Sequence, residues 1–185
     1  IGNKIIDVAS GTGDLAKTIS EKNDNQNIVY CVEPNKGMLE TGKEKLKSFN
    51  NIKWYQHSAE KLLFKDNFFD FYTISYGIRN VTDINSCLGE AYRVLKPGGR
   101  FLCLEFSKVE NEILKLLYKK YSKLIPIFGK IIVGSAEPYE YLVNSIEKFY
   151  SQNDLSALLI NNNFSNVQFR NLSNGISAIH SGWKI

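Results

Sequence analysis

The chain has 185 residues, which is enough for one domain with its own core and short for two. Hydrophobic residues make up 43% and charged residues 23%, which excludes a disordered chain and a multispan membrane protein. The net charge is only +4, and four of the 23 basic residues are arginine, so the composition argues against a nucleic-acid partner. We therefore expect a single domain over residues 1–185.

The cysteine and histidine content narrows the chemistry further. Cys31, Cys87 and Cys103 are far apart and form no C-x-x-C motif, and no secretory signal is present. This pattern predicts an intracellular chain with free thiols. His57 and His180 are too few for a zinc cluster or a Ser-His-Asp triad. We expect no metal and a reaction that depends on a cofactor.

Apolar runs alternate with amphipathic segments over the first 106 residues. We expect strands at 4–8, 28–32, 52–56, 68–76 and 101–106, and helices at 14–22, 35–48 and 83–95. Such alternation predicts right-handed βαβ units and a parallel sheet. The segment 96–99, Lys-Pro-Gly-Gly, is expected to end the third helix. The first strand begins three residues after Ile1 and no Met precedes it, which predicts an N-terminally truncated domain.

The pattern changes after the fifth predicted strand. Helices are expected at about 110–125, 137–149 and 151–161, and we interpret residues 107–150 as a helical insertion that forms a substrate pocket or lid. Ser151 and Asp154 have the spacing of a capping box. Asn174-Gly175 between strand-like runs predicts a hairpin. The predicted fold class is α/β, with a doubly wound, mostly parallel seven-stranded sheet and an antiparallel C-terminal hairpin.

A glycine loop and two acids mark a ligand site. Gly11-Thr12-Gly13 joins the first strand to a helix at the carboxyl edge of the predicted sheet, where such folds bind ligands. Glu33 ends the second strand, where an acid accepts hydrogen bonds from ribose hydroxyls. The spacing G-x-G-x-x-A also fits NAD, but a carboxylate at Asp7 repels a pyrophosphate and suits the cationic S-adenosylmethionine. The alternative is a tight turn beside a capping acid.

Six stretches of the chain resemble the class I methyltransferases, and more narrowly the ubiquinone and menaquinone biosynthesis C-methyltransferases. They are DVASGTGD (7–14), TISYGIRNVTD (73–83), YRVLKPGG (92–99), LEFSK (104–108), YEYL (139–142) and IHSGW (179–183). The segment GIRNV (77–81) is the most specific to the quinone family. The resemblance implies a Rossmann-like class I methyltransferase fold and SAM-dependent C-methylation of a polyprenyl quinol, either 2-polyprenyl-6-methoxy-1,4-benzoquinol, demethylmenaquinol or both.

The resemblance also implies roles for individual residues. The cofactor S-adenosylmethionine, and its product S-adenosylhomocysteine, would contact the following residues: Asp7, Gly11, Thr12, Gly13, Glu33, Ser58, Ala59 and Ser75. The family usually has Asp at position 33 and Asn or Asp at position 58. Arg79 and Asn80 are the predicted catalytic residues. Because arginine keeps its proton, we interpret Arg79 as the cation that stabilises a phenolate and Asn80 as the group that orients the ring oxygen. The alternative for Arg79 is a surface ion pair.

Four further residues are weaker candidates for substrate contacts, namely Tyr76, Glu105, Tyr139 and Tyr141, and each is also consistent with a packing role. The predicted helix 110–125 has one apolar side and a side with four lysines. Such a helix can lie on a membrane surface or can cover the substrate site with its lysines in solvent. A polyprenyl quinol lies in the bilayer, which makes membrane contact useful.

The sequence leaves several alternatives open. The chain could be another small-molecule O- or N-methyltransferase, a non-catalytic SAM-binding scaffold, or, as a third choice, an NAD-linked dehydrogenase. A homodimer or a quinone-biosynthesis complex is an expected assembly. The expected location is the cytoplasm, at the inner membrane of a bacterium, or alternatively the matrix face of the mitochondrial inner membrane. The sequence does not distinguish benzoquinol from naphthoquinol, and it does not identify the tail length or the proton acceptor.

Overall fold

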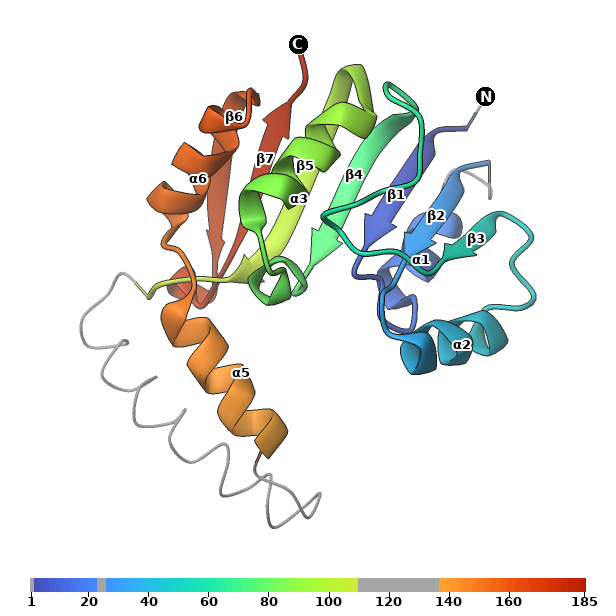
Figure 1. Cartoon of the computed structure of the whole chain (residues 1–185), viewed down its shortest axis with the longest axis horizontal. Coiled ribbons are helices and arrows are strands. Elements are labelled where there is room, and N and C mark those ends of the chain that lie inside the picture. The colour runs from blue at the N-terminus through green and yellow to red at the C-terminus, as the bar shows by residue number, and fades with distance from the viewer. Residues whose placement is uncertain (1, 23–25, 110–136) are drawn as a thin grey trace.

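A seven-stranded sheet forms the centre of the computed structural model, which describes residues 2–22, 26–109 and 137–185 (Figure 1). The strands are β1 (Lys4–Val8), β2 (Ile28–Val32), β3 (Ile52–Tyr55), β4 (Phe69–Ser75), β5 (Leu95–Phe106), β6 (Ser165–Leu172) and β7 (Ser177–Trp183). Their order across the sheet is β3-β2-β1-β4-β5-β7-β6. Strands β1 to β5 pair in parallel, and β7 is antiparallel to both β5 and β6. The predicted fold class and the C-terminal hairpin are confirmed.

Helices cover both faces of this sheet (Figure 1). They are α1 (Asp14–Ser20), α2 (Lys36–Lys45), α3 (Ile84–Val94), α5 (Glu137–Lys148) and α6 (Gln152–Asn161). Helices α3 and α6 lie over one face of the half that contains β4 to β7, whereas α1 packs on the other face beside β2. Helix α5 extends beyond the end of β5, at the edge where the parallel strands terminate. That placement brings α5 next to the predicted site.

Short polar side chains fix where the helices begin. The Asn35 side chain accepts a hydrogen bond from the amide of Met38, the third residue of α2, at 3.1 Å, and the Asp83 side chain accepts one from the amide of Asn85, the second residue of α3, at 3.0 Å. Ser151 and Asp154 form the reciprocal bonds of the capping box that their spacing predicted. Each cap fixes the point at which its helix begins, and the caps at Asn35 and Asp83 thereby fix loops at the edge of the sheet.

The core consists of alternate residues of the central strands. One face of the sheet packs against α3 and α6 through a buried cluster whose strand members include Ile6, Val8, Tyr72, Ile74, Phe101 and Cys103. A smaller cluster on the other face contains Ala16, Val29 and Cys31. Burial of each large apolar side chain contributes about 1.5–3 kcal/mol. All three cysteines are free, as the sequence predicted, and the structure shows that they are also buried. The strands therefore hold their carboxyl ends in fixed positions.

The start of β5 differs from the prediction. Helix α3 ends at Val94, just before the segment 96–99, as expected, but this segment lies inside β5, which begins at Leu95 rather than at Phe101. A register shift between Phe69 and Phe71 absorbs the turn, and Gly98 takes a positive φ of 80°. The amide of Gly98 donates to the Lys184 carbonyl at 2.6 Å, so the C-terminal end of the chain supplies pairing that the local sequence could not reveal.

Some predictions fall on residues 110–136, outside the described residues. The basic helix at 110–125 is among them, and so is most of the insertion at 107–150, of which α5 is described. Within the described ranges, no helix has both the length and the apolar character needed to cross a membrane.

Candidate functional site

The glycine loop follows β1 at the edge where the parallel strands end. Gly11 and Gly13 take positive φ angles of 56° and 84°, which side-chain-bearing residues adopt at a cost. A Cβ at Gly13 would lie 2.9 Å from the Trp54 ring, whereas a Cβ at Gly11 would meet nothing within 4 Å. Gly13 is therefore needed for packing below the loop, and Gly11 leaves an open space above it that a ligand can occupy.

Glu33 closes one side of this loop. Its side chain is buried, with 5% exposure, at the end of β2. One carboxylate oxygen accepts a hydrogen bond from the Gly11 amide and the other accepts one from the Asn35 amide, both at 2.9 Å. Each oxygen retains a second lone pair for a ligand hydroxyl. The carboxylate is thus held in a fixed orientation beside the glycine loop, as a ribose contact requires.

Asp7 lies in β1, directly below the loop, and is 1% exposed. Burial raises its pKa to about 6, while a hydrogen bond from the Thr73 hydroxyl at 2.7 Å acts in the opposite direction. Ser10 donates to the Asp7 carbonyl at 2.6 Å and tightens the same turn. Asp7 therefore supports the loop from within the protein and places a largely ionised carboxylate under the ligand region at pH 7.

The segment after β4 touches the glycine loop. Tyr76 takes a positive φ of 52°, an uncommon conformation for a large side chain, and such conformations cluster at functional sites. A Cβ on the next residue, Gly77, would lie 2.4 Å from the Cβ of Ala9. Glycine at position 77 therefore allows the GIRNV segment to lie directly against the glycine loop.

Arg79 lies in the 3₁₀ helix η2 (Ile78–Asn80) and forms a buried ion pair with Glu105 of β5. Their closest atoms, Nη1 and Oε1, are 2.7 Å apart, and the side chains are 10% and 1% exposed. Burial raises the pKa of Glu105, and the charge of Arg79 opposes that shift. The sequence alternative for Arg79 was an ion pair at the surface, and the structure instead gives a buried pair at the edge of the sheet.

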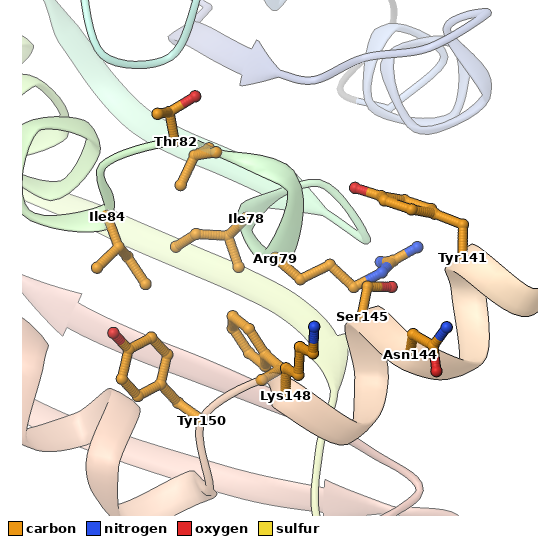
Figure 2. Close-up of a pocket in the computed structure, with 11 residues that line it drawn as sticks. Ile78, Arg79, Thr82, Ile84, Tyr141, Asn144, Ser145, Lys148 and Tyr150 are labelled. Carbon is orange, nitrogen blue, oxygen red and sulfur yellow. The ribbon is translucent and has the colours of Figure 1, made fainter.

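A pocket of about 500 Å³ separates η2 from α5 (Figure 2). Its lining residues are Ile78, Arg79, Val81, Thr82, Ile84, Tyr141, Asn144, Ser145, Lys148, Phe149 and Tyr150. Across it, the Tyr141 hydroxyl donates to Asn80 Oδ1 at 3.0 Å, which joins α5 to the predicted catalytic segment. The pocket therefore combines an apolar floor with the polar groups expected at a reacting ring.

The remaining predicted residues lie at different places along the edge. Ser75 ends β4 and is partly buried, and Ala59 is buried beside an exposed Ser58 after β3. The Thr12 hydroxyl donates to Asp14 at 3.1 Å. Tyr139 is partly buried on α5 and does not line the pocket.

The Tyr76 hydroxyl lies 3.2 Å from the Ser177 hydroxyl, and its ring centroid is 4.7 Å from that of Phe106. Taken together, the positions of the predicted residues show that one edge of the sheet contains the glycine loop, Glu33, Ser75, Arg79 and Asn80.

Sequence reasoning missed Thr73 and the pocket residues Lys148 and Tyr150. Thr73 pairs with Asp7, a residue 66 positions away, so only the register of β1 against β4 reveals the contact. Alternation along β4 places a polar residue on the face that bears Asp7, and this signal could have identified Thr73. Lys148 and Tyr150 lie at and just beyond the end of α5, whose position against η2 depends on tertiary packing alone.

The fold and the strand-edge site define a class I methyltransferase. Solved structures with this fold include a SAM-dependent methyltransferase from Aquifex aeolicus, with TM-score 0.71 and 16% identity over 100% of this chain and 83% of that chain. A possible histamine N-methyltransferase from Thermotoga maritima matches with TM-score 0.71 and 21% identity, over 100% of this chain and 83% of that chain. At these identities the likeness shows the fold alone.

The sequence places the chain more narrowly. Residues 1–184 match the model of the ubiE/COQ5 methyltransferase family. The chain is 50% identical to the ubiquinone/menaquinone biosynthesis C-methyltransferase UbiE of Rickettsia prowazekii, over 100% of this chain and 77% of that protein. It is 49% identical to the UbiE protein of Brucella abortus (strain S19), over 97% of this chain and 68% of that protein. The chain belongs to the ubiE/COQ5 methyltransferase family, and the predicted family and enzyme class are confirmed.

The contact between Gly77 and Ala9 generates the first prediction. Gly77→Ala would place a Cβ 2.4 Å from the Cβ of Ala9. Overpacking of this kind lowers the free energy of unfolding by about 1–3 kcal/mol. We expect a lower free energy of unfolding in urea, together with weaker binding of S-adenosylhomocysteine, because the glycine loop must move. The matched control is Gly89→Ala in α3, where an added Cβ meets nothing within 4 Å and helix propensity should raise stability by up to about 1 kcal/mol. Equal behaviour of the two variants would contradict the close approach.

Proposed function

We propose that this protein uses S-adenosylmethionine to methylate a ring carbon of a polyprenyl quinol. One observation carries the proposal: the buried Glu33 and the open glycine loop, which together suit a nucleoside, lie beside the GIRNV segment that contains Arg79 and Asn80 and resembles the quinone family. Relatives from Rickettsia and Brucella that are 50% and 49% identical to this chain are named for C-methylation in ubiquinone and menaquinone biosynthesis.

The cofactor assignment rests on the shape and charge of the strand edge. Gly11 leaves open space, and Glu33 presents a fixed carboxylate that can accept hydrogen bonds from both ribose hydroxyls. Asp7 adds negative charge below the loop, which favours a ligand with a sulfonium and an ammonium over a pyrophosphate. Ser75 ends the adjacent strand β4, and we propose that it contacts the methionine part.

The chemistry requires an activated ring carbon beside the methyl group. S-adenosylmethionine supplies the electrophilic methyl when bound. The protein must hold the ring carbon about 3–3.5 Å from that methyl and in line with the leaving sulfur. The ring carbon becomes nucleophilic as a neighbouring phenol loses its proton. Arg79 stabilises the resulting negative charge on oxygen, and the side-chain amide of Asn80 orients the same oxygen.

The contact between Tyr141 and Asn80 determines which way that amide points. Because the Tyr141 hydroxyl donates to Oδ1, the Nδ2 group of Asn80 is left to donate to the ring oxygen. The pocket between η2 and α5 can then receive an apolar part of the substrate against Ile78, Ile84 and Phe149. Its volume of about 500 Å³ is within the range of small-molecule sites.

Replacement of Glu33 tests the cofactor assignment. Glu33→Ala removes the acceptor for the ribose hydroxyls and for the Gly11 amide, and unpaired polar groups of this kind cost about 1–3 kcal/mol. We therefore expect calorimetry to show a loss of about 5- to 150-fold in affinity for S-adenosylhomocysteine. Glu40→Ala removes an exposed glutamate of α2 and should leave the affinity unchanged. Tight NAD binding, or an affinity insensitive to Glu33→Ala, would contradict the assignment.

The transfer itself can be followed with a labelled methyl group. The intact protein, S-adenosylmethionine with an isotopically labelled methyl and a short-chain polyprenyl quinol kept reduced should yield a product labelled on a ring carbon. The oxidised quinone should not react, because its ring lacks the electron density that a phenolate supplies. Mass spectrometry of the benzoquinol and naphthoquinol products would identify the preferred ring. A label on oxygen would favour an O-methyltransferase, and no labelled product from any quinol would refute the proposed function.

A further inference from the structure

Glu105 has no surface with which to meet a substrate. Its side chain is 1% exposed, at the penultimate position of β5. Oε1 accepts hydrogen bonds from Arg79 Nη1 at 2.7 Å and from the Phe106 amide at 2.8 Å, and Oε2 accepts one from the Arg79 amide at 3.3 Å. The carboxylate thus binds both the backbone and the side chain of the same arginine. Any effect of Glu105 on the reaction must pass through Arg79.

The guanidinium of Arg79 is held at one end and has no partner among the described residues at the other. Nη1 donates to Glu105 Oε1 and to the Tyr76 carbonyl, both at 2.7 Å, and Cζ lies 5.3 Å from the centre of the Phe106 ring. Nε is buried and has no hydrogen-bond partner among the described residues, and Nη2 donates to none of them. A buried donor without a partner is costly, which indicates that a ligand completes this end.

We propose that Glu105 is the positioning residue of this site, which fixes Arg79 through Nη1 so that Nε and Nη2 face the quinol oxygen. The proposal rests on the proposed function and names the part of the protein that sets the geometry of its charge-stabilising group. From the sequence, Glu105 was a candidate for direct contact with the substrate. In this proposal Glu105 instead acts indirectly, through Arg79. Arginine is required because its planar fork supplies donors in two directions, whereas lysine cannot bind Glu105 and Tyr76 and still reach the substrate in a fixed geometry.

The electrostatics of the pair are consistent with this role. Two charges that are both nine-tenths buried are stable only when they are paired and hydrogen-bonded, so Glu105 allows a guanidinium to lie inside the edge of the sheet. The raised pKa of Glu105 reflects the cost of that burial. Because the pair is formally neutral, the negative charge that develops on the ring oxygen is stabilised by directed N–H groups that are already in place.

An isosteric substitution tests the proposal in the intact protein. Glu105→Gln keeps the shape but removes the charge that holds the guanidinium, and we expect kcat for quinol methylation to fall by about 10²-fold. The KM for quinol and the affinity for S-adenosylhomocysteine should change less than about threefold, because neither ligand touches Glu105. The matched control is Glu90→Gln in α3, which breaks another arginine pair, with Arg93 at 2.6 Å, away from the strand edge. This control should keep the wild-type kcat.

A second measurement does not depend on turnover. In ¹⁵N NMR spectra of the arginine side chains, the Arg79 guanidinium should give sharp, slowly exchanging signals in the wild type and averaged signals in Glu105→Gln, with no change in Glu90→Gln. Free methylguanidinium should also raise the methylation rate of Arg79→Ala by at least about tenfold. It should not raise the rate of the double variant Arg79→Ala/Glu105→Gln.

The outcomes separate the positioning role from the proposed function. Wild-type kcat in Glu105→Gln, unchanged Arg79 signals or equal rescue of the single and double variants would overturn the role of Glu105. Failure of the wild-type protein to methylate any quinol would instead overturn the proposed function, while the NMR comparison would still decide whether Glu105 orders Arg79. If Arg79→Ala does not fold, Glu105→Gln decides the question alone.

Discussion

Burial of carboxylates at the ends of three parallel strands is the constraint on which this site depends. Asp7, Glu33 and Glu105 are 1%, 5% and 1% exposed, and they lie at or next to the carboxyl ends of β1, β2 and β5. A buried carboxylate is tolerated only when hydrogen bonds or a cation compensate it. Here the compensating donors come from residues of the site itself, so the same charges that are costly to bury also fix the loops that bind ligands.

Each carboxylate fixes a different part of the site. Asp7 is bonded by Thr73 and ties the base of the glycine loop to β4. Glu33 accepts a hydrogen bond from the Gly11 amide and fixes the side of the loop where we propose that the nucleoside binds. Glu105 holds Arg79, and Gly77 brings that arginine's segment against the loop. The proposed cofactor region and the proposed substrate region are therefore parts of one connected structure, which suits a reaction in which the attacking carbon, the methyl group and the leaving sulfur must be in line.

The sequence predicted those features that local chemistry determines. Alternating apolar runs, the capping-box spacing of Ser151 and Asp154, and the Asn174-Gly175 turn identified the elements and the hairpin, because each of these signals depends only on residues close together in the sequence. The glycine loop and Glu33 were also predictable, since parallel strands end at a common edge.

The remaining features depend on packing between distant segments. The Arg79–Glu105 pair joins residues 26 positions apart, and the pairing of the Gly98 segment with Lys184 moved the start of β5 forward to Leu95. No local pattern contains the register that brings these residues together. The resemblance identified Arg79 as important, but only the structure revealed that its charge is already partnered and that two of its nitrogens face no described partner.

The central claim is that buried carboxylates preorganise one site for a nucleoside sulfonium and an aromatic ring. A crystal structure of the intact protein with S-adenosylhomocysteine tests it most directly. The account predicts ribose hydroxyls within hydrogen-bond distance of Glu33, a retained bond between Glu33 and the Gly11 amide, and the sulfur on the side of the loop that faces Arg79. A nucleoside bound elsewhere, or a Glu33 side chain that leaves Gly11 when the ligand binds, would contradict it.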